Sequence, residues 1–238
     1  MKTYITIKIK EIIKFYDEKE NENSKHVSSI TAIIGEDLGA GLIKHYFKKN
    51  KIESEIIDIT PREKVNKGAG KWLDRWIKVY DNETIYYQTE IKNWSSYSKG
   101  GKKIILHESE LVKMANERFA KEWLKQKQRF KEDAVNKVLL DMKINKEDYN
   151  SHNFPKIKQE FVKPLICYWW PILKDLDQSP FFEVDCSKNK ETSFKKVYFF
   201  SMSMYLRCLL KNGTETINIE APNVIKRYKL IENILILE

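Results

Sequence analysis

Alternating apolar and polar residues near the start of the chain predict a β-strand. Ile5, Ile7 and Ile9 are separated by single polar residues, which is the spacing of a strand that buries one face. From about 30 to 49 the apolar positions instead recur every three or four residues, and this period predicts an amphipathic helix that packs against a sheet. The helical period is formed by Leu38, Leu42, Ile43, Tyr46 and Phe47.

Three strand segments follow, and the last two are predicted to form a hairpin. The segments are Ile52 to Ile59, Trp72 to Tyr80 and Thr84 to Trp94. The turn-forming residues Asp81 and Asn82 separate the last two segments, which favours a tight antiparallel connection.

The rest of the chain adds helices and strands in an order that predicts a mixed α/β protein. Apolar runs predict strands, and the first of them is continuous enough to be buried on both faces. Ser201 or Ser203 is expected to cap the next helix, and Gly213 to end it. These elements are a long helix at about 108–144, strands at 164–170 and 197–200, and helices at about 201–210 and 222–237.

Composition and charge narrow the class of protein. The 238 residues are 42% apolar and 32% charged, as in a folded domain with a solvated surface. No run of 18 or more apolar residues and no apolar leader occurs, so we expect a cytoplasmic protein without a membrane partner. The net charge of +9 favours polyanionic partners such as nucleic acids.

Two acidic residues of the hairpin are predicted to face each other. With a loop of three residues at 81–83, counting outward from the turn pairs Asp74 with Glu90. Opposite residues lie about 5 Å apart at Cβ, and two unit charges at that distance repel by about 3 kcal/mol at an effective dielectric near 20. Lys92 on the same face offsets part of this repulsion. A Mg²⁺ or Mn²⁺ ion would offset more, and the carbonyl of Ile91 could add an oxygen ligand.

The pattern of Asp74 followed by Glu90, Ile91 and Lys92 resembles the PD-(D/E)xK nuclease superfamily. The resemblance implies that the two acids hold Mg²⁺ and that the lysine orients the attacking water and stabilises charge at the phosphate. Many members add a glutamate from the preceding helix, and Glu36 occupies that place. Leu73 stands where the motif's proline would be, so the similarity rests on the three core residues and on the order of elements.

The resemblance implies a restriction-endonuclease-like fold, in which a mixed β-sheet is flanked by helices, with an additional C-terminal strand and helices. We expect residues 1–28 to form a strand and a polar connection, and residues 29–238 a single nuclease-like domain. Its core would cover about 30–170 and a C-terminal elaboration about 171–238. The implied activity is Mg²⁺-dependent hydrolysis of DNA, by endo- or exonucleolytic cleavage, in restriction, defence or repair. A homodimer is compatible with cutting both strands.

Several alternatives stay open at this point. The acids and Lys92 would form a surface salt bridge if no metal binds. Glu36 would interact with the dipole at the start of its helix without binding a metal. Asp37 would be the metal ligand instead of Glu36 if the helix is rotated. The lysines of the following loop would contact nucleic-acid phosphates or remain solvated, and they are Lys99, Lys102 and Lys103. The strand tryptophans are more often core residues than base-stacking ones. A non-catalytic DNA-binding subunit and an RNA-cleaving nuclease are the rival functions.

Overall fold

The structure is a computed structural model of the chain, and it describes residues 4–17, 27–57, 75–92, 105–107, 109, 161–173, 179–185 and 196–234. At positions 27, 28, 90, 162 and 173 it describes the backbone alone. The long helix predicted at about 108–144 therefore lies, apart from residue 109, outside the described residues.

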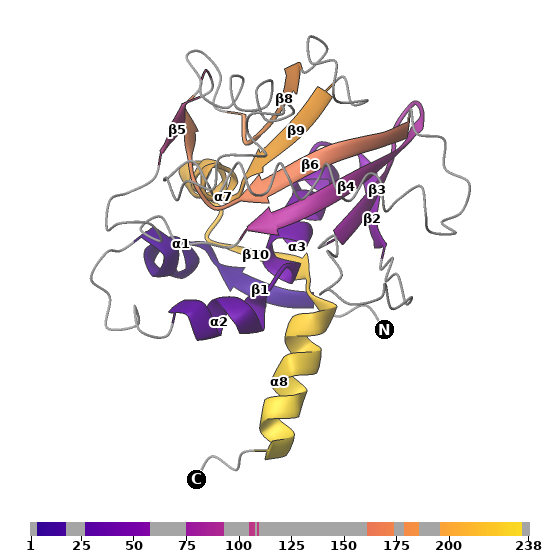
Figure 1. Ribbon diagram of the computed structural model, residues 1–238. Coiled ribbons are helices and arrows are strands. Elements are labelled where there is room, and N and C mark those ends of the chain that lie inside the picture. The colour runs from indigo at the N-terminus through magenta and orange to yellow at the C-terminus, as the bar shows by residue number, and fades with distance from the viewer. Residues whose placement is uncertain are drawn as a thin grey trace, which may run out of the picture.

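A mixed six-stranded sheet forms the centre of the molecule (Figure 1). In spatial order its strands are β2 (Glu53–Ile57), β3 (Arg75–Tyr80), β4 (Thr84–Lys92), β6 (Val162–Tyr168), β9 (Lys196–Ser201) and β8 (Phe181–Asp185). β2, β3 and β4 are antiparallel, β4, β6 and β9 are parallel, and β8 returns antiparallel to β9. A mixed sheet with flanking helices confirms the predicted α/β class.

The β3–β4 hairpin has the predicted register. Tyr80 pairs with Thr84 and Trp76 pairs with Gln88, so the loop is the three-residue segment 81–83. Trp76 is 2% exposed, which agrees with its interpretation as a core residue.

The apolar run at 164–170 forms the interior strand β6. Leu165, Ile166 and Cys167 are each 0% exposed. Because successive strand residues point to opposite faces, burial of three in a row shows that both faces of β6 are covered. The prediction for this strand is confirmed.

The single helix predicted at about 30–49 is two helices, α2 (Val27–Ile34) and α3 (Asp37–Lys49). Gly35 lies between them with φ of 56°. This left-handed conformation ends α2 and is accessible to glycine without a side-chain clash. The continuous-helix prediction was therefore wrong at this residue.

Two glycines let α3 approach its neighbours closely. A Cβ added at Gly41 would lie 2.8 Å from the carbonyl oxygen of Glu220, and one at Gly39 would lie 2.6 Å from Cγ2 of Ile91. Contacts this short leave no room for a side chain, which explains glycines inside a helix. α3 thus lies directly against β4 and the C-terminal strand that contains Glu220.

Replacing Gly41 with alanine is expected to destabilise the protein by about 1–3 kcal/mol, because the added methyl overpacks a backbone contact. The gain in helix propensity is only about 1 kcal/mol and does not offset a clash with a carbonyl oxygen. Urea denaturation measures the change. Lys48→Ala, at an exposed position of α3, is the matched control and should change stability by less than about 0.5 kcal/mol. A Gly41→Ala protein as stable as the parent would contradict this packing.

A strand near the start of the chain and one near its end pair in a second, two-stranded sheet. β1 (Tyr4–Lys8) pairs antiparallel with β10 (Thr216–Glu220). The paired residues Thr6 and Asn218 are 212 positions apart in the sequence. β1 is followed directly by α1 (Ile9–Asp17). Sequence reasoning extended the strand through Ile9 and did not identify α1 or β10, although Ile217 and Ile219 alternate with polar residues.

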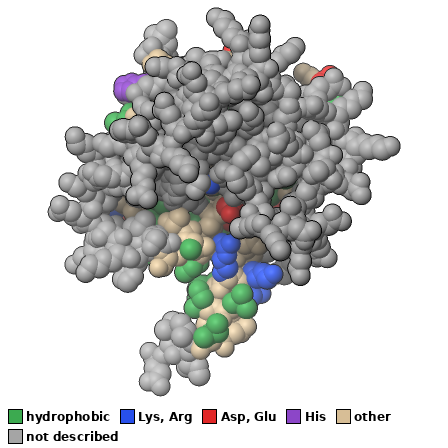
Figure 2. Space-filling model, viewed as in Figure 1, with side chains coloured by type: hydrophobic (Ala, Val, Ile, Leu, Met, Phe, Trp, Pro, Cys, Tyr) green, Lys and Arg blue, Asp and Glu red, His purple; other side chains and the backbone are tan. Residues whose placement is uncertain are grey.

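Two C-terminal helices complete the described structure. In α7 (Met202–Lys211) the Ser201 hydroxyl accepts from the Met204 amide at 3.3 Å, and Gly213 has φ of 79° after the helix ends; both termini agree with the prediction. α8 (Pro222–Ile234) projects away from the sheets, with apolar and basic side chains on its surface (Figures 1 and 2).

The remaining strands are β5 (Leu106–His107) and β7 (Ile172–Leu173), which pair in parallel. No helix within the described ranges combines the length and apolar character needed to cross a bilayer.

Candidate active site

The structure describes part of the predicted site. Glu36, Ile91 and Lys92 are described with their side chains, and Glu90 with its backbone alone. Asp74 lies outside the described residues, as do the predicted DNA-contacting lysines at positions 99, 102 and 103. The last described pair of the hairpin is Arg75 with Thr89. Asp74 and Glu90 would form the next pair, so their contact stays a prediction.

The end of β4 lies beside the end of the parallel strand β6. Ile91 pairs with Cys167 and Lys92 with Tyr168. Ile91 is 5% exposed, and Lys92 is half-buried. Binding sites of open α/β sheets often lie outside the carboxyl ends of parallel strands. This end of the sheet is therefore a candidate position for a binding site.

The two faces of the sheet carry different parts of the predicted site. Ile91 contacts α3 at Gly39, and Tyr87 stacks on Phe47 of α3 at 5.7 Å between ring centroids. Because the side chains of a strand point alternately to its two faces, Lys92 lies on the face opposite to Ile91. Glu36, next to the start of α3, lies on the α3 side. The structure therefore does not bring Glu36 and Lys92 together on one face.

An ion-pair network occupies the α3 side at the start of β3. Arg75 is bound to two acids, since its Nη1 donates to Glu36 Oε2 at 2.7 Å and its Nη2 donates to Asp37 Oδ1 at 3.0 Å. The Glu36 side chain is 38% exposed and that of Asp37 only 2%. Glu36 thus forms a partly solvated ion pair, whereas Asp37 forms a buried one.

Asp37 also holds the start of α8. Its Oδ2 accepts from the backbone amides of Asn223 and Val224 at 2.6 and 3.0 Å, and its Oδ1 accepts from Asn223 Nδ2 at 3.0 Å. Amides in the first turn of a helix lack partners within the helix, and a negative charge there is favoured by the dipole. Asp37 therefore acts as a helix cap supplied from 186 residues away.

The tyrosine beside Lys92 is unsuited to proton transfer. Tyr168 is 2% exposed, and complete burial, with a smaller contribution from Cys167, raises the pKa of its hydroxyl well above 10. Burial disfavours the phenolate because the charge would lose its hydration. The Tyr168 hydroxyl therefore stays protonated at neutral pH.

The predicted donors are chemically suited to magnesium. Carboxylate and carbonyl oxygens are hard ligands, which Mg²⁺ and Mn²⁺ prefer, and Asp74, Glu90 and Ile91 would supply them. Within the described ranges alone, no group of three His, Cys, Asp or Glu side chains could hold a metal. Asp37 is not such a ligand, because each of its oxygens already accepts two hydrogen bonds. Glu36 accepts from Arg75 through Oε2.

Sequence reasoning missed the network around Arg75. Arg75 follows the predicted Asp74 directly, but a single arginine in a strand gives no signal of its partners. Asn223 after Pro222 marks a helix start, yet nothing local shows that Asp37 caps it. Only contacts between segments distant in sequence reveal this cluster.

Comparison with protein-family models, with curated proteins and with solved structures gives no match to this chain.

Proposed function

We propose that the chain is a metal-dependent nuclease that hydrolyses phosphodiester bonds in DNA. The observation that carries the proposal is the register of the β3–β4 hairpin, described as far as Arg75 and Thr89. One further pair in the same register would set Asp74 opposite Glu90. Directly opposed residues lie about 5 Å apart at Cβ, and a divalent cation between two such carboxylates would relieve their repulsion.

The order of elements supports the same proposal. Helix α3, strand β2, the β3–β4 hairpin and strand β6 occur along the chain in the order that the resemblance to the restriction-endonuclease-like fold implies. The long helix expected between the hairpin and β6 lies, apart from residue 109, outside the described residues, and the short strand β5 is described there. β4 and β6 are parallel neighbours, so both strands end at the proposed site. A substrate would therefore contact Glu90 and Lys92 at the carboxyl ends of these parallel strands.

The residues of the chain have distinct roles in the proposed reaction. Asp74, Glu90 and the Ile91 carbonyl would hold Mg²⁺, and Glu36, which pairs with Arg75 on the α3 side, is not part of this set. When bound, such an ion polarises a phosphate and lowers the pKa of a coordinated water. Lys92 positions the attacking water and offsets the negative charge that develops on the phosphate. The net charge of +9 favours the approach of DNA.

The test is cleavage of supercoiled plasmid by the purified chain. We expect nicked and linear products with Mg²⁺ and none with excess EDTA. Glu90→Gln, prepared in parallel, keeps the size of the side chain and removes its charge, so it should lose cleavage and show that the activity belongs to this chain. Equal cleavage by Glu90→Gln would remove the site assignment.

The same preparation separates the rival functions. Binding to DNA that weakens with salt, without any Mg²⁺-dependent cleavage, would indicate a non-catalytic DNA-binding subunit. Competition among duplex DNA, single-stranded DNA and single-stranded RNA identifies the preferred substrate. Preferential cleavage of RNA would replace DNA in the proposal and keep the site.

A further inference from the structure

Arg75 holds the end of β3 against α3 by a two-point contact. Its guanidinium donates through Nη1 to Glu36 at 2.7 Å and through Nη2 to Asp37 at 3.0 Å. Because the two donors bind two different carboxylates, the planar guanidinium is fixed in orientation as well as in position. The Arg75 side chain is only 13% exposed, so the contact is largely shielded from screening by salt.

The anchor on α3 is itself held in place. Asp37 is buried and also accepts from two first-turn amides of α8 at 2.6 and 3.0 Å. Gly39, on the next turn of α3, lies against Ile91 of β4, where an added Cβ would be 2.6 Å from Cγ2. α3 is thus fixed to α8 and to β4, and Arg75 ties the end of β3 to the same helix.

Neutralisation of Asp37 does not account for the whole contact. Asp37 already accepts three hydrogen bonds from α8, and one cationic donor would be enough to pair with its charge. The second donor of Arg75 instead binds Glu36, which is partly exposed and therefore solvated without an ion pair. The fork of donors is suited to fixing the position of the strand end.

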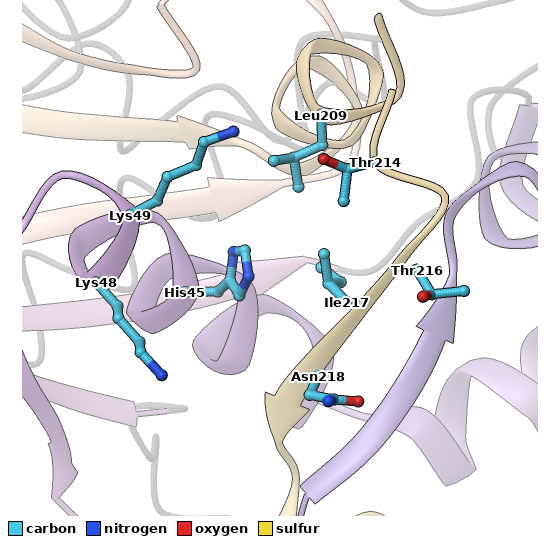
Figure 3. A pocket seen from close by; sticks show the side chains of 8 residues that line it. All are labelled: His45, Lys48, Lys49, Leu209, Thr214, Thr216, Ile217 and Asn218. Carbon is cyan, nitrogen blue, oxygen red and sulfur yellow. The ribbon is translucent and has the colours of Figure 1, made fainter. Parts of the chain in front are cut away.

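The other end of α3 is arranged differently. A pocket of 540 Å³ opens there between α3, α7 and β10, and Lys48 and Lys49 of the last turn line it (Figure 3). Ile217 of β10 points into this pocket, whereas Asn218 is turned away, and its Oδ1 accepts from the Thr6 hydroxyl of β1 at 2.8 Å. Lysines in the last turn are favoured by the helix dipole without any ligand. The connected polar network of α3 is therefore the one at its start.

The end of β3 is where the proposed site requires most restraint. Arg75 is the first residue of β3 and pairs with Thr89 of β4, and the preceding Asp74 lies outside the described residues. Because side chains alternate along a strand, Asp74 would point away from the α3 face that Arg75 occupies and toward the face of Glu90. Like charges opposed in this way destabilise strand pairing, so an unanchored end would separate from β4.

We propose that Arg75 is a positioning residue of the metal site: by clamping the end of β3 to Glu36 and Asp37, it holds Asp74 opposite Glu90 before the ion binds. This inference rests on the proposed function, because it concerns the same pair of acids. Arg75 contacts neither the ion nor the substrate, since its side chain lies on the other face of the sheet. The clamp offsets the repulsion between the acids in advance, and such preorganisation raises the affinity for Mg²⁺.

The test is the affinity for Mn²⁺ of the parent and of Arg75→Lys, measured by electron paramagnetic resonance of the unbound ion. Lysine keeps the positive charge beside Asp37 but replaces the planar fork with a single ammonium, so the variant should fold with a weaker hold on β3. Circular dichroism checks the fold. We expect the affinity for Mn²⁺ to fall about 10- to 100-fold, the usual effect of losing a group that orients metal ligands.

The dependence of cleavage on Mg²⁺ distinguishes positioning from other roles. In Arg75→Lys the Mg²⁺ concentration that gives half of the maximal rate should rise by a similar factor. The rate at saturating Mg²⁺ should change little, because the acids no longer repel each other once the ion is bound. Lys78→Gln is a control on the same strand, since it removes an ion pair with Glu55 of β2 and should bind Mn²⁺ like the parent.

Glu36→Gln is a second test that remains decisive if Arg75→Lys does not fold. It removes one arm of the clamp at a partly exposed position, so it should fold and lose less affinity for Mn²⁺ than Arg75→Lys. Unchanged affinity in Glu36→Gln would overturn the two-point clamp. A larger loss than in Arg75→Lys would make Glu36 a ligand of the ion and would also overturn it.

The outcomes separate this inference from the proposed function. Equal Mn²⁺ affinity in Arg75→Lys and the parent, or a lower maximal rate with unchanged dependence on Mg²⁺, would overturn the positioning role and leave the nuclease proposal intact. Mn²⁺ binding that Glu90→Gln does not weaken would instead remove the metal site, and the role of Arg75 with it.

Discussion

The Asp37→Ala variant is expected to lower the free energy of unfolding by about 3–5 kcal/mol, as removal of one partner from a buried ion pair does. Asp37 is 2% exposed and accepts from Arg75 and from the first turn of α8. Its loss removes the buried acid that pairs with the guanidinium of Arg75, and it removes the side-chain acceptor of two part-buried amides in the first turn of α8. Each unsatisfied group adds a desolvation penalty.

Urea denaturation and hydrogen exchange measure this effect. The amides of Asn223 and Val224, which donate to Asp37, should lose their protection from exchange first. Glu36→Ala is the matched control, since Glu36 binds the same arginine but is 38% exposed. Exposed ion pairs contribute about 0–1 kcal/mol, so this variant should remain nearly as stable as the parent. Equal losses in the two variants would show that burial of Asp37 does not matter.

The Lys92→Ala variant is expected to lose about 10²- to 10³-fold in the rate of DNA cleavage, the usual effect of removing one group that stabilises charge in a transition state. Lys92 is half-buried at the end of β4, where the proposed site opens. Lys92→Arg keeps the charge but changes its geometry, and should restore only part of the rate. Single-turnover cleavage of plasmid at saturating Mg²⁺ measures the loss.

A control separates this effect from the general loss of a positive charge. Lys196 is an exposed lysine of β9 that pairs with the exposed Glu183 at 2.6 Å. Lys196→Ala should change DNA cleavage by less than about twofold, because a solvated ion pair contributes little. If Lys92→Ala and Lys196→Ala reduce the rate equally, Lys92 acts through net charge and has no role in catalysis.

Local patterns predicted the elements whose signals lie within a few residues. The hairpin register followed from its short turn, because a loop of fixed length determines every pair along both strands. The buried strand β6 followed from its continuous apolar run, and the start of α7 from a serine that can cap it. In each case the residues that decide the structure are neighbours in sequence.

Predictions failed or stayed incomplete where a distant segment decides the structure. The break at Gly35 adjoins Arg227, which donates to the Ile33 carbonyl at 2.9 Å, and this contact cannot be read from residues 30–49. β10 was missed because its partner β1 is at the other end of the chain. Glu36 was predicted from its order before the hairpin, but order does not determine on which face of a sheet a side chain lies.

The sequence by itself determined the class of the fold and the hairpin, and it predicted the pair of acids that we propose to bind an ion. These depend on periodicity, turn length and residue chemistry, which are local properties. Tertiary structure alone decided that Asp37 caps α8, that Arg75 binds Glu36, and that a basic pocket forms between α3 and β10. Each of these requires groups far apart in the chain to meet at hydrogen-bonding distance, and only the packing of α3 against the strands and α8 brings them there.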